Sequence, residues 1–286
     1  IPPDDFKNLN WQLSNRDNEP EHPPSLMLSR ATKAKDNLKE TLPIFLALAV
    51  WSIAAISYRM PFLLPNPLEV LQAFVFDFDL IIGGLWITFQ EALYGYLLAI
   101  SIGITTAAIM SQSKILERSF YPYAILLQTL PAVAVAPLIV LWFGFDMLSV
   151  VIISLIISLF PIINNTLLGL KSTSTNLVEL FQMHNSSRFV NFFKLRLPAA
   201  IPHIIAGLRI SAGLSVIGAI VGEFIIGSGS MGGGLGVMII YAQGDLETAL
   251  VMALILTATL LGFIFFMSVT ALGHQLLKHW HESEIS

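Results

Sequence analysis

The stretch Lys171–Pro202, KSTSTNLVELFQMHNSSRFVNFFKLRLPAAIP, is the longest polar interruption between the hydrophobic segments of this chain. Its apolar residues follow helical spacing over residues 176–183, and a second amphipathic run covers residues 189–197, before Pro198. A polar break at residues 185–187 separates the two runs. Two short helices joined by a turn have no interior in which to bury apolar side chains. The stretch therefore predicts a surface that binds a partner protein.

The rest of the chain is predominantly hydrophobic. Its 286 residues are 55% hydrophobic and only 12% charged, with a mean hydropathy of +0.74, which excludes an ordinary soluble globular domain. The chain contains no cysteine, so disulfides, thiol chemistry and cysteine metal sites are excluded. Six segments approach the roughly 20 residues that cross a bilayer, and they predict an all-α integral membrane protein with six transmembrane helices. These segments are residues 42–58, 84–110, 120–143, 147–170, 201–226 and 248–273.

The distribution of Lys and Arg predicts the orientation of these spans, because basic residues concentrate in cytoplasmic segments. With six spans both termini lie on one side, and that side receives 13 of the 15 basic residues. We therefore expect a polar cytoplasmic tail over residues 1–40, which includes a basic helix before the membrane. A six-span domain over residues 41–275 follows, with the 171–202 stretch as a cytoplasmic loop. Residues 276–286 are expected to form a cytoplasmic C-terminal tail.

The sequence also predicts local features within the spans and in the segment between the first two. Pro131 and Pro137 predict that the third span is kinked or broken. Glu91, with the glutamine before it, comes near the start of the second span, so we expect it at the membrane interface rather than in the middle of the bilayer. Between the first two spans, Asn66 and the prolines beside it predict the start of a short amphipathic helix. Small residues over 211–219 of the fifth span predict close helix packing, which we expect at a subunit interface.

Polar residues inside the spans are costly in hydrocarbon and therefore face a cavity or a neighbouring helix. On this ground, five residues are candidates for lining a translocation path. They are Gln128, Thr129, Asn164, Asn165 and Glu223. The alternative for each of them is a hydrogen bond between helices, with no contact to a transported solute.

The 171–202 stretch resembles the EAA loop of permease subunits of ATP-binding-cassette (ABC) importers. That pattern is E-A-A, three residues, G, nine residues, I, one residue, and L-P. The residues at the pattern's positions are Glu179, Leu180, Phe181, Asn185, Leu195, Leu197 and Pro198. The spacing from Glu179 to Pro198 fits without a gap, although Leu180 and Phe181 replace the two alanines. Asn185 replaces the glycine, and asparagine tolerates a positive-φ turn better than other residues do. The resemblance implies that these seven residues couple the chain to an ATPase.

The resemblance extends over roughly residues 64–236, to permeases of the nitrate, sulfonate, taurine and bicarbonate group. Matching segments include Leu64–Pro67, residues 131–138, Gly222-Glu223 and Gly234–Gly236. The resemblance implies the type I ABC-importer permease fold in a bacterial-type inner membrane. It implies transport of a small anion resembling nitrate, sulfonate, taurine or bicarbonate. Permeases for thiamine precursors and riboflavin share much of the pattern, so a small heteroaromatic cargo is the alternative.

The same resemblance implies the partners of the chain. These are two ABC ATPase subunits, a second permease chain that is identical or different, an extracytoplasmic substrate-binding protein and the lipid bilayer, with no nucleic acid. The ATPase subunits would use ATP and Mg, whereas no cofactor is expected on this chain. No Gly-Lys dipeptide occurs in the sequence, so the phosphate-binding loop of an ATPase is missing. We therefore expect a transporter subunit without catalytic residues.

Two motifs in the sequence resemble functional sites of other protein classes. Residues 227–232 fit the dinucleotide pattern G-x-G-x-x-G, but no βαβ unit surrounds them, so a flexible turn is expected. His279 and His281 have no further ligands nearby, which favours anchoring at the interface with Trp280 over a metal site.

Two other classes of protein are alternatives. A secondary transporter would normally show internal repeats and charged relays in the middle of the membrane, and the sequence shows neither convincingly. A membrane scaffold or enzyme is the second class, and the sequence contains no catalytic constellation for an enzyme.

Overall fold

The computed structural model describes residues 42–43, 45–57, 60, 62–184, 186–226 and 233–281. The predicted N-terminal tail, Asn185, the glycine-rich turn at 227–232 and the last five residues lie outside the described residues. The chain divides into two compact units, residues 1–57 and 58–286. In the first unit the described residues include an apolar helix, Phe45–Ser57.

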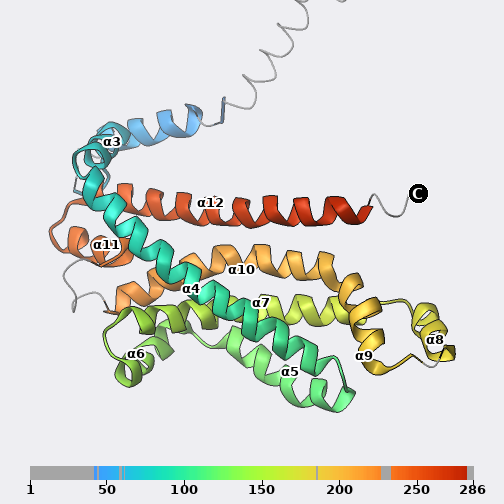
Figure 1. Cartoon of the computed structure of the whole chain (residues 1–286). Coiled ribbons are helices and arrows are strands. Elements are labelled where there is room, and N and C mark those ends of the chain that lie inside the picture. The colour runs from blue at the N-terminus through green and yellow to red at the C-terminus, as the bar shows by residue number, and fades with distance from the viewer. Residues whose placement is uncertain are drawn as a thin grey trace, which may run out of the picture. The chain divides into compact units, whose positions relative to one another are not determined.

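Four helices of the second unit are long and apolar enough to cross a membrane, and they confirm the second, fourth, fifth and sixth predicted segments as helices (Figure 1). They are α4 (Phe78–Met110), α7 (Met147–Lys171), a continuous helix Arg188–Ile226 that ends in α10 (Leu197–Ile226), and α12 (Thr248–His281). The last helix continues into the segment predicted as a C-terminal tail, so helical structure extends further than expected there.

The third predicted span consists of two helices, α5 (Lys114–Thr129) and α6 (Ala132–Phe143), which meet at an angle of 99°. This break was predicted from Pro131. Leu130 has extended backbone angles (φ −65°, ψ 123°), because the ring of a proline disfavours α-helical geometry in the residue before it. Counted as one span, the bent pair raises the number of candidate spans among the described residues from four to five. The first predicted span contains the shorter helix Phe45–Ser57, so six spans remain a prediction.

The tightest packing in the second unit joins α7 to α10 and α4. An ideal Cβ at Gly218 of α10 would lie 2.6 Å from Cα of Ser154 in α7, so only glycine permits this approach. Ser154 Oγ donates to the carbonyl oxygen of Ser215 at 2.8 Å. Ser211 Oγ donates to the carbonyl oxygen of Ser158 at 2.6 Å. Apart from Gly213, which has open space beside it, the small residues of the fifth span therefore pack inside this chain. This corrects the expectation that they form a subunit interface.

Two shorter helices, α3 (Pro67–Phe76) and α11 (Leu235–Gly244), complete the second unit together with the loop helices described below. A capping box starts α3: the side chain of Asn66 accepts the N–H of Leu68 at 3.2 Å, and the Glu69 carboxylate accepts the N–H of Asn66 at 2.9 Å. This confirms the short helix predicted between the first two spans. The other helix, α11, packs on α4, α10 and α12.

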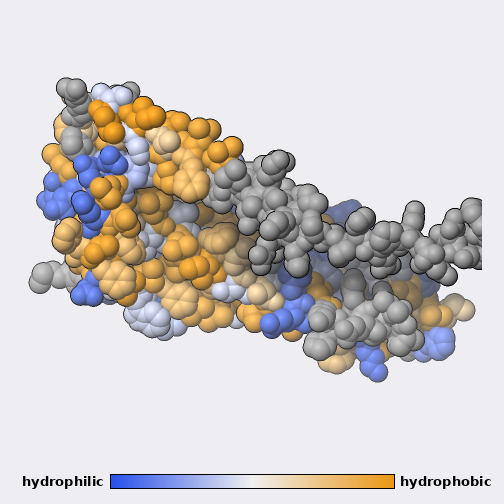
Figure 2. All heavy atoms as spheres, turned by 90° about the horizontal axis from the view of Figure 1, so that it is seen from above, coloured by the Kyte–Doolittle hydropathy of each residue, from blue (hydrophilic) through white to orange (hydrophobic). Residues whose placement is uncertain are grey.

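Large apolar side chains remain exposed along the helices, including Trp86, Leu141 and Leu260. Figure 2 shows hydrophobic surface along the middle of the visible face, with hydrophilic residues gathered toward its ends. An apolar surface of this extent is unusual for a soluble monomer and typical of a protein embedded in lipid.

Candidate functional site

The 171–202 stretch contains two helical segments, as predicted. The first is α8 (Thr175–Met183), which coincides with the helix expected over residues 176–183. Ser186 closes its C-terminal end by donating both its backbone N–H (3.1 Å) and its hydroxyl (2.7 Å) to the carbonyl oxygen of Phe181. Glu179 and Leu180 on this helix are exposed, and Phe181 is partly buried.

The second helical segment begins at Arg188 and continues into the membrane-spanning helix. Ser187 caps its start, because Ser187 Oγ accepts the N–H of Val190 at 3.3 Å. The helix α9 (Arg188–Asn191) leads into one π-helical turn, η1 (Phe192–Arg196), and then directly into α10.

Pro198 lies at the start of α10 and does not separate it from η1. We expected the amphipathic helix to end before Pro198 and the span to begin at residue 201, so this boundary is corrected. A proline cannot donate a backbone hydrogen bond, so a continuous helix through it needs a local adjustment. The π turn provides the adjustment, since the N–H of Leu197 donates to Phe192, five residues earlier.

Apolar side chains project from both helical segments. We define the α8–η1 face as the exposed set Leu177, Leu180, Met183, Phe189 and Phe193. The rings of Phe189 and Phe193 contact each other in a tilted arrangement, with centroids 4.4 Å apart and 42° between their planes. Leu195, Leu197 and Pro198, at the base of the loop, are partly buried. An exposed apolar face of this kind is typical of a protein interaction surface.

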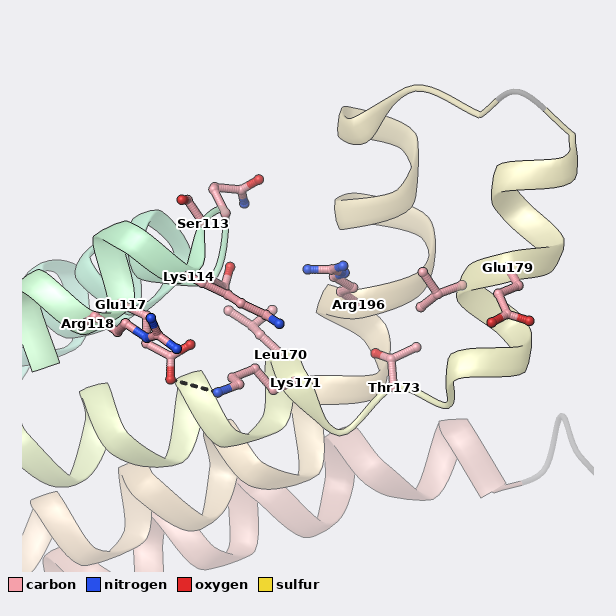
Figure 3. A pocket seen from close by; sticks show the side chains of 12 residues that line it. Ser113, Lys114, Glu117, Arg118, Leu170, Lys171, Thr173, Glu179 and Arg196 are labelled. Carbon is pink, nitrogen blue, oxygen red and sulfur yellow. Dashed lines mark hydrogen bonds and ion pairs between the residues drawn. The ribbon is translucent and has the colours of Figure 1, made fainter.

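A pocket of about 760 Å³ opens beside α8, between α5, the end of α7 and η1 (Figure 3). Glu179 lines this pocket together with Lys114, Arg118, Lys171 and Arg196. One ion pair crosses it, in which Lys171 Nζ donates to Glu117 Oε1 at 2.7 Å. The pocket therefore gathers charges from four separate segments at the end of the molecule where α8 lies.

The interior polar candidates do not share one location. Gln128 and Thr129 are exposed in the last turn of α5, directly before the 99° bend. Thr129 Oγ1 donates to the carbonyl oxygen of Leu126 at 3.1 Å. These two side chains thus mark the break between α5 and α6.

Asn164 and Asn165 are partly buried in α7. Asn164 Oδ1 accepts the hydroxyl of Tyr121 in α5 at 2.9 Å, which connects two helices. Asn165 Nδ2 donates to the carbonyl oxygen of Pro161 in its own helix at 2.8 Å. This bond lies within α7 and does not connect it to another helix.

Glu223 is the most completely buried of the five candidates, with 1% of its surface exposed. Its Oε1 accepts the hydroxyl of Thr88 in α4 at 2.7 Å. Its Oε2 accepts the backbone N–H of Gly236 at 2.5 Å. Thr88 Oγ1 in turn accepts the N–H of Leu235 at 2.8 Å. The first N–H groups of α11 are thereby held by side chains from α4 and α10, as helix N-termini require.

Two glycines of the Gly234-Leu235-Gly236 segment make room for this contact. A Cβ at Gly234 would overlap the Glu223 carboxyl group, and a Cβ at Gly236 would lie 2.7 Å from Glu223 Oε2. The glycines are therefore required by the close approach of α11 to a buried carboxylate.

Glu91 is a polar interior residue that the sequence analysis did not include among its candidates. We expected it at the membrane interface. Instead α4 begins at Phe78, so Glu91 lies about 20 Å along the helix from its start, and it is only 5% exposed. Its carboxyl group contacts that of Glu223, and its Oε2 is buried with no hydrogen-bond partner among the described residues. The spacing of three residues from Thr88 puts both on one helix face, a signal that was available in the sequence.

Glu91 and Glu223 line a small cavity of about 180 Å³ together with Asp146. The cavity lies where the loop between α6 and α7 meets the segment before α11. Three carboxyl groups from three parts of the chain thus border one space. Among the described residues, no group of three or more acidic, histidine or cysteine side chains is arranged to hold a metal ion.

The chain matches the family described as binding-protein-dependent transport system inner membrane component over residues 99–278. It is 32% identical over 248 residues to the formylaminopyrimidine transport permease protein ThiX of Halalkalibacterium halodurans, covering 86% of this chain and 97% of that protein. It is 31% identical over 242 residues to the putative aliphatic sulfonates transport permease protein SsuC of Bacillus subtilis, covering 82% and 85%. The crystal structure of an amino acid ABC transporter with histidines is similar in fold, with a TM-score of 0.57 at 18% identity, over 73% of this chain and 97% of that one.

The family match covers well over half of the chain, and it includes the loop helices and three of the four long spans. The helical, apolar architecture agrees with it. This chain belongs to the binding-protein-dependent inner membrane components: it is a permease subunit of an ABC importer and not itself the ATPase.

Proposed function

We propose that this chain, paired with a second permease chain, forms the translocation path of a six-span type I importer. The first of the six spans would include the helix Phe45–Ser57. The 171–202 loop and both termini would face the cytoplasm, as the distribution of basic residues favours. ATP and Mg would be used by separate ATPase subunits, and an extracytoplasmic binding protein would deliver the cargo.

The observation that carries this proposal is the continuous helix Arg188–Ile226. One end of it belongs to the exposed loop, and the other end holds Glu223 and, through it, the start of α11. A helix of this length extends on the order of 50 Å. A displacement of the loop is therefore transmitted to the α11 end by a single rigid element.

The ATPase would bind the α8–η1 face, with Glu179 supplying charge at its edge. Leu180 and Phe181 would contribute apolar contacts from α8, and Asn185 would form the turn. Leu195, Leu197 and Pro198 would join the loop to α10, where the π turn fixes the direction of the helix. Closure of two ATPases would move the two loops of a permease pair together and switch the path from inward-facing to outward-facing.

The path itself would be bordered by the polar interior residues. We assign Glu223, with Glu91, to its α11 end, since their carboxyl groups border a cavity. Gln128 and Thr129 at the bend, and Asn164 and Asn165 in α7, are the remaining candidates. Their hydrogen bonds to neighbouring helices support a positioning role as the alternative.

The charge of the interior bears on the cargo. Glu91, Asp146 and Glu223 border one cavity, and none of the described residues that line it is basic. Carboxyl oxygens accept hydrogen bonds from N–H donors, and an anion would find no positive charge in this lining. We therefore propose a small heteroaromatic cargo with N–H donors, the class that includes the formylaminopyrimidine of one relative's name. A sulfonate-type anion is the second candidate, supported by the similarity to SsuC.

The test is uptake into proteoliposomes that contain this chain with its ATPase and its binding protein. ATP-dependent accumulation of labelled formylaminopyrimidine, unaffected by excess taurine or an alkanesulfonate, is the expected result. Uptake of the sulfonate instead would reverse the cargo assignment and leave the permease assignment intact. Accumulation by this chain alone, without an ATPase, would overturn the coupling mechanism.

A further inference from the structure

The pocket beside α8 carries an excess of positive charge that the coupling mechanism does not use. Four of its lining residues are basic, and two are acidic. The basic residues are Lys114 and Arg118 from α5, Lys171 from the end of α7 and Arg196 from η1. Within the part of the chain that the structure describes, only Lys171 has an ion-pair partner, Glu117.

Two of the unpaired basic side chains approach each other. In Figure 3, Lys114 extends from α5 and Arg196 from η1 toward the same space. Like charges in one pocket repel, so their convergence favours a counter-ion between them. Basic residues that only determine membrane orientation need not share a pocket, whereas these two line the same open pocket of about 760 Å³.

The pocket also holds donors that are suited to an anion. The Oγ1 atom of Thr173 is buried and has no hydrogen-bond partner among the described residues, although Thr173 lines the pocket. The 16-residue helix α5 begins at the pocket, with Ser113 as its N-cap. Backbone N–H groups at a helix N-terminus attract negative charge.

We propose that this pocket binds a phosphate-bearing anion. The planar guanidinium of Arg196 would bind two phosphate oxygens, Lys114 would supply a second positive charge, and the hydroxyl of Thr173 would donate a hydrogen bond. The volume is in the range of pockets that accept small organic ligands. The phosphate group could belong to a free anion or to the headgroup of an anionic lipid, since both present the same oxygens.

Occupancy of this pocket would connect three elements. Arg196 belongs to the loop helix that we assign to coupling, whereas Lys114 and Thr173 lie on α5 and just after α7. An anion shared by them would restrain the loop against the body of the protein. The inference concerns a binding site and does not depend on the identity of the cargo.

The test measures binding of inorganic phosphate to the full-length chain in phosphatidylcholine nanodiscs by equilibrium dialysis. We expect saturable binding, and an increase in Kd of about tenfold or more in the Lys114→Gln/Arg196→Gln variant, since each lost charged hydrogen bond contributes about this factor. The matched control is Arg188→Gln/Lys194→Gln, which removes the same amount of charge from residues of the 171–202 loop that do not line the pocket. Its Kd should stay within about twofold of wild type.

A second arm distinguishes the lipid source. The same proteins are placed in nanodiscs containing phosphatidylglycerol, and retained lipid is measured by native mass spectrometry. Retention that is lost in the pocket variant but not in the control, with no phosphate binding in the first arm, would assign the site to a lipid headgroup. Equal losses in the pocket variant and the control, or no binding in either arm, would overturn the proposal.

The single variant Lys114→Gln is a second test for the case that the double variant misfolds. It should fold normally, because Lys114 is exposed and makes no ion pair with another described residue. It should weaken phosphate binding while it leaves the circular dichroism spectrum unchanged. Absence of cargo uptake by the wild-type complex would contradict the proposed function alone. Absence of binding in both arms would contradict this inference alone.

Discussion

The hydroxyl of Thr88 donates to Glu223 Oε1 at 2.7 Å, across 135 residues of sequence. The same oxygen of Thr88 accepts the backbone N–H of Leu235 at 2.8 Å. One hydroxyl group therefore joins α4, α10 and α11 at a position with no measurable solvent exposure. Buried polar groups contribute to stability only while all of their partners are present.

Replacement of Thr88 by valine should lower the thermal stability of the purified chain. The change keeps the shape of the side chain but leaves the Leu235 N–H and one Glu223 oxygen without their partner. Each buried polar group left unpaired costs about 1–3 kcal/mol. We expect the apparent Tm in detergent to fall by about 2–4 °C for each kcal/mol lost. Thr88→Ser retains the hydroxyl and is the control, and a valine variant as stable as the serine variant would contradict the network.

Two glycines of α10 test how closely this helix packs on α7. A Cβ at Gly218 would lie 2.6 Å from Cα of Ser154, whereas a Cβ at Gly213 would have no atom within 4 Å. Gly218→Ala should therefore force the helices apart and lower the apparent Tm. Gly213→Ala should be neutral or stabilise the protein by about 0.5–1 kcal/mol, because alanine favours helix more than glycine does. Equal melting temperatures for both variants would show that the close helix contact is wrong.

Much of the architecture was predictable from local sequence patterns. The hydropathy pattern predicted the four long helices, and Pro131 predicted the break in the third span. Both predictions succeed because they depend on residues that are close together in the sequence. The short helix after Asn66 and the α8 helix were predicted for the same reason. Pro198 was misjudged as a boundary, since a π turn in the residues before it allows the helix to continue.

The interior contacts could not be predicted in this way. The small residues around Ser211 predicted tight packing correctly, but their partner on α7 depends on the three-dimensional arrangement. The polarity of Glu91 suggested a helix end, whereas its partner Glu223 is more than a hundred residues away. Sequence alone therefore identified Glu223 as unusual and did not identify what surrounds it.

The coupling assignment predicts a selective effect of charge reversal at Glu179. This residue is exposed, and no hydrogen bond or ion pair to another described residue involves it, so Glu179→Lys should leave the apparent Tm unchanged. Placed in the ATPase interface, the new charge should reduce ATP-dependent uptake by about tenfold or more, since like charges at an interface are strongly unfavourable. Asp79→Lys, an exposed charge reversal on α4 at the other end of the molecule, is the control. Wild-type uptake by the Glu179 variant would remove this residue from the coupling site.

The ion pair between Lys171 and Glu117 should contribute little to stability. Their side chains are 50% and 26% exposed, and exposed pairs contribute about 0.2–1 kcal/mol, less at high salt. Lys171→Gln should therefore shift the apparent Tm by no more than about 1–3 °C, and the shift should shrink in 0.5 M salt. A larger shift that persists in salt would mean that the pair is buried in the assembled protein.

The hydrogen bond between Tyr121 and Asn164 offers a way to separate a path-lining role from a positioning role. Tyr121→Phe removes the donor and leaves Asn164 in place, whereas Asn164→Ala removes the side chain. If Asn164 only holds α5 against α7, both variants should lose about 0.5–1.5 kcal/mol and the double variant little more, because both remove the same bond. The KM for uptake should then be similar in all three.

Contact with the cargo gives a different pattern in the same set of variants. Asn164→Ala should then raise the KM for uptake several-fold, while Tyr121→Phe should alter stability and leave the KM near its wild-type value. The double variant should combine a KM change from one residue with a stability change from the other. Since the amide of Asn164 has donors that Tyr121 does not use, the two roles are compatible. The KM of the alanine variant therefore decides whether α7 contributes to the translocation path.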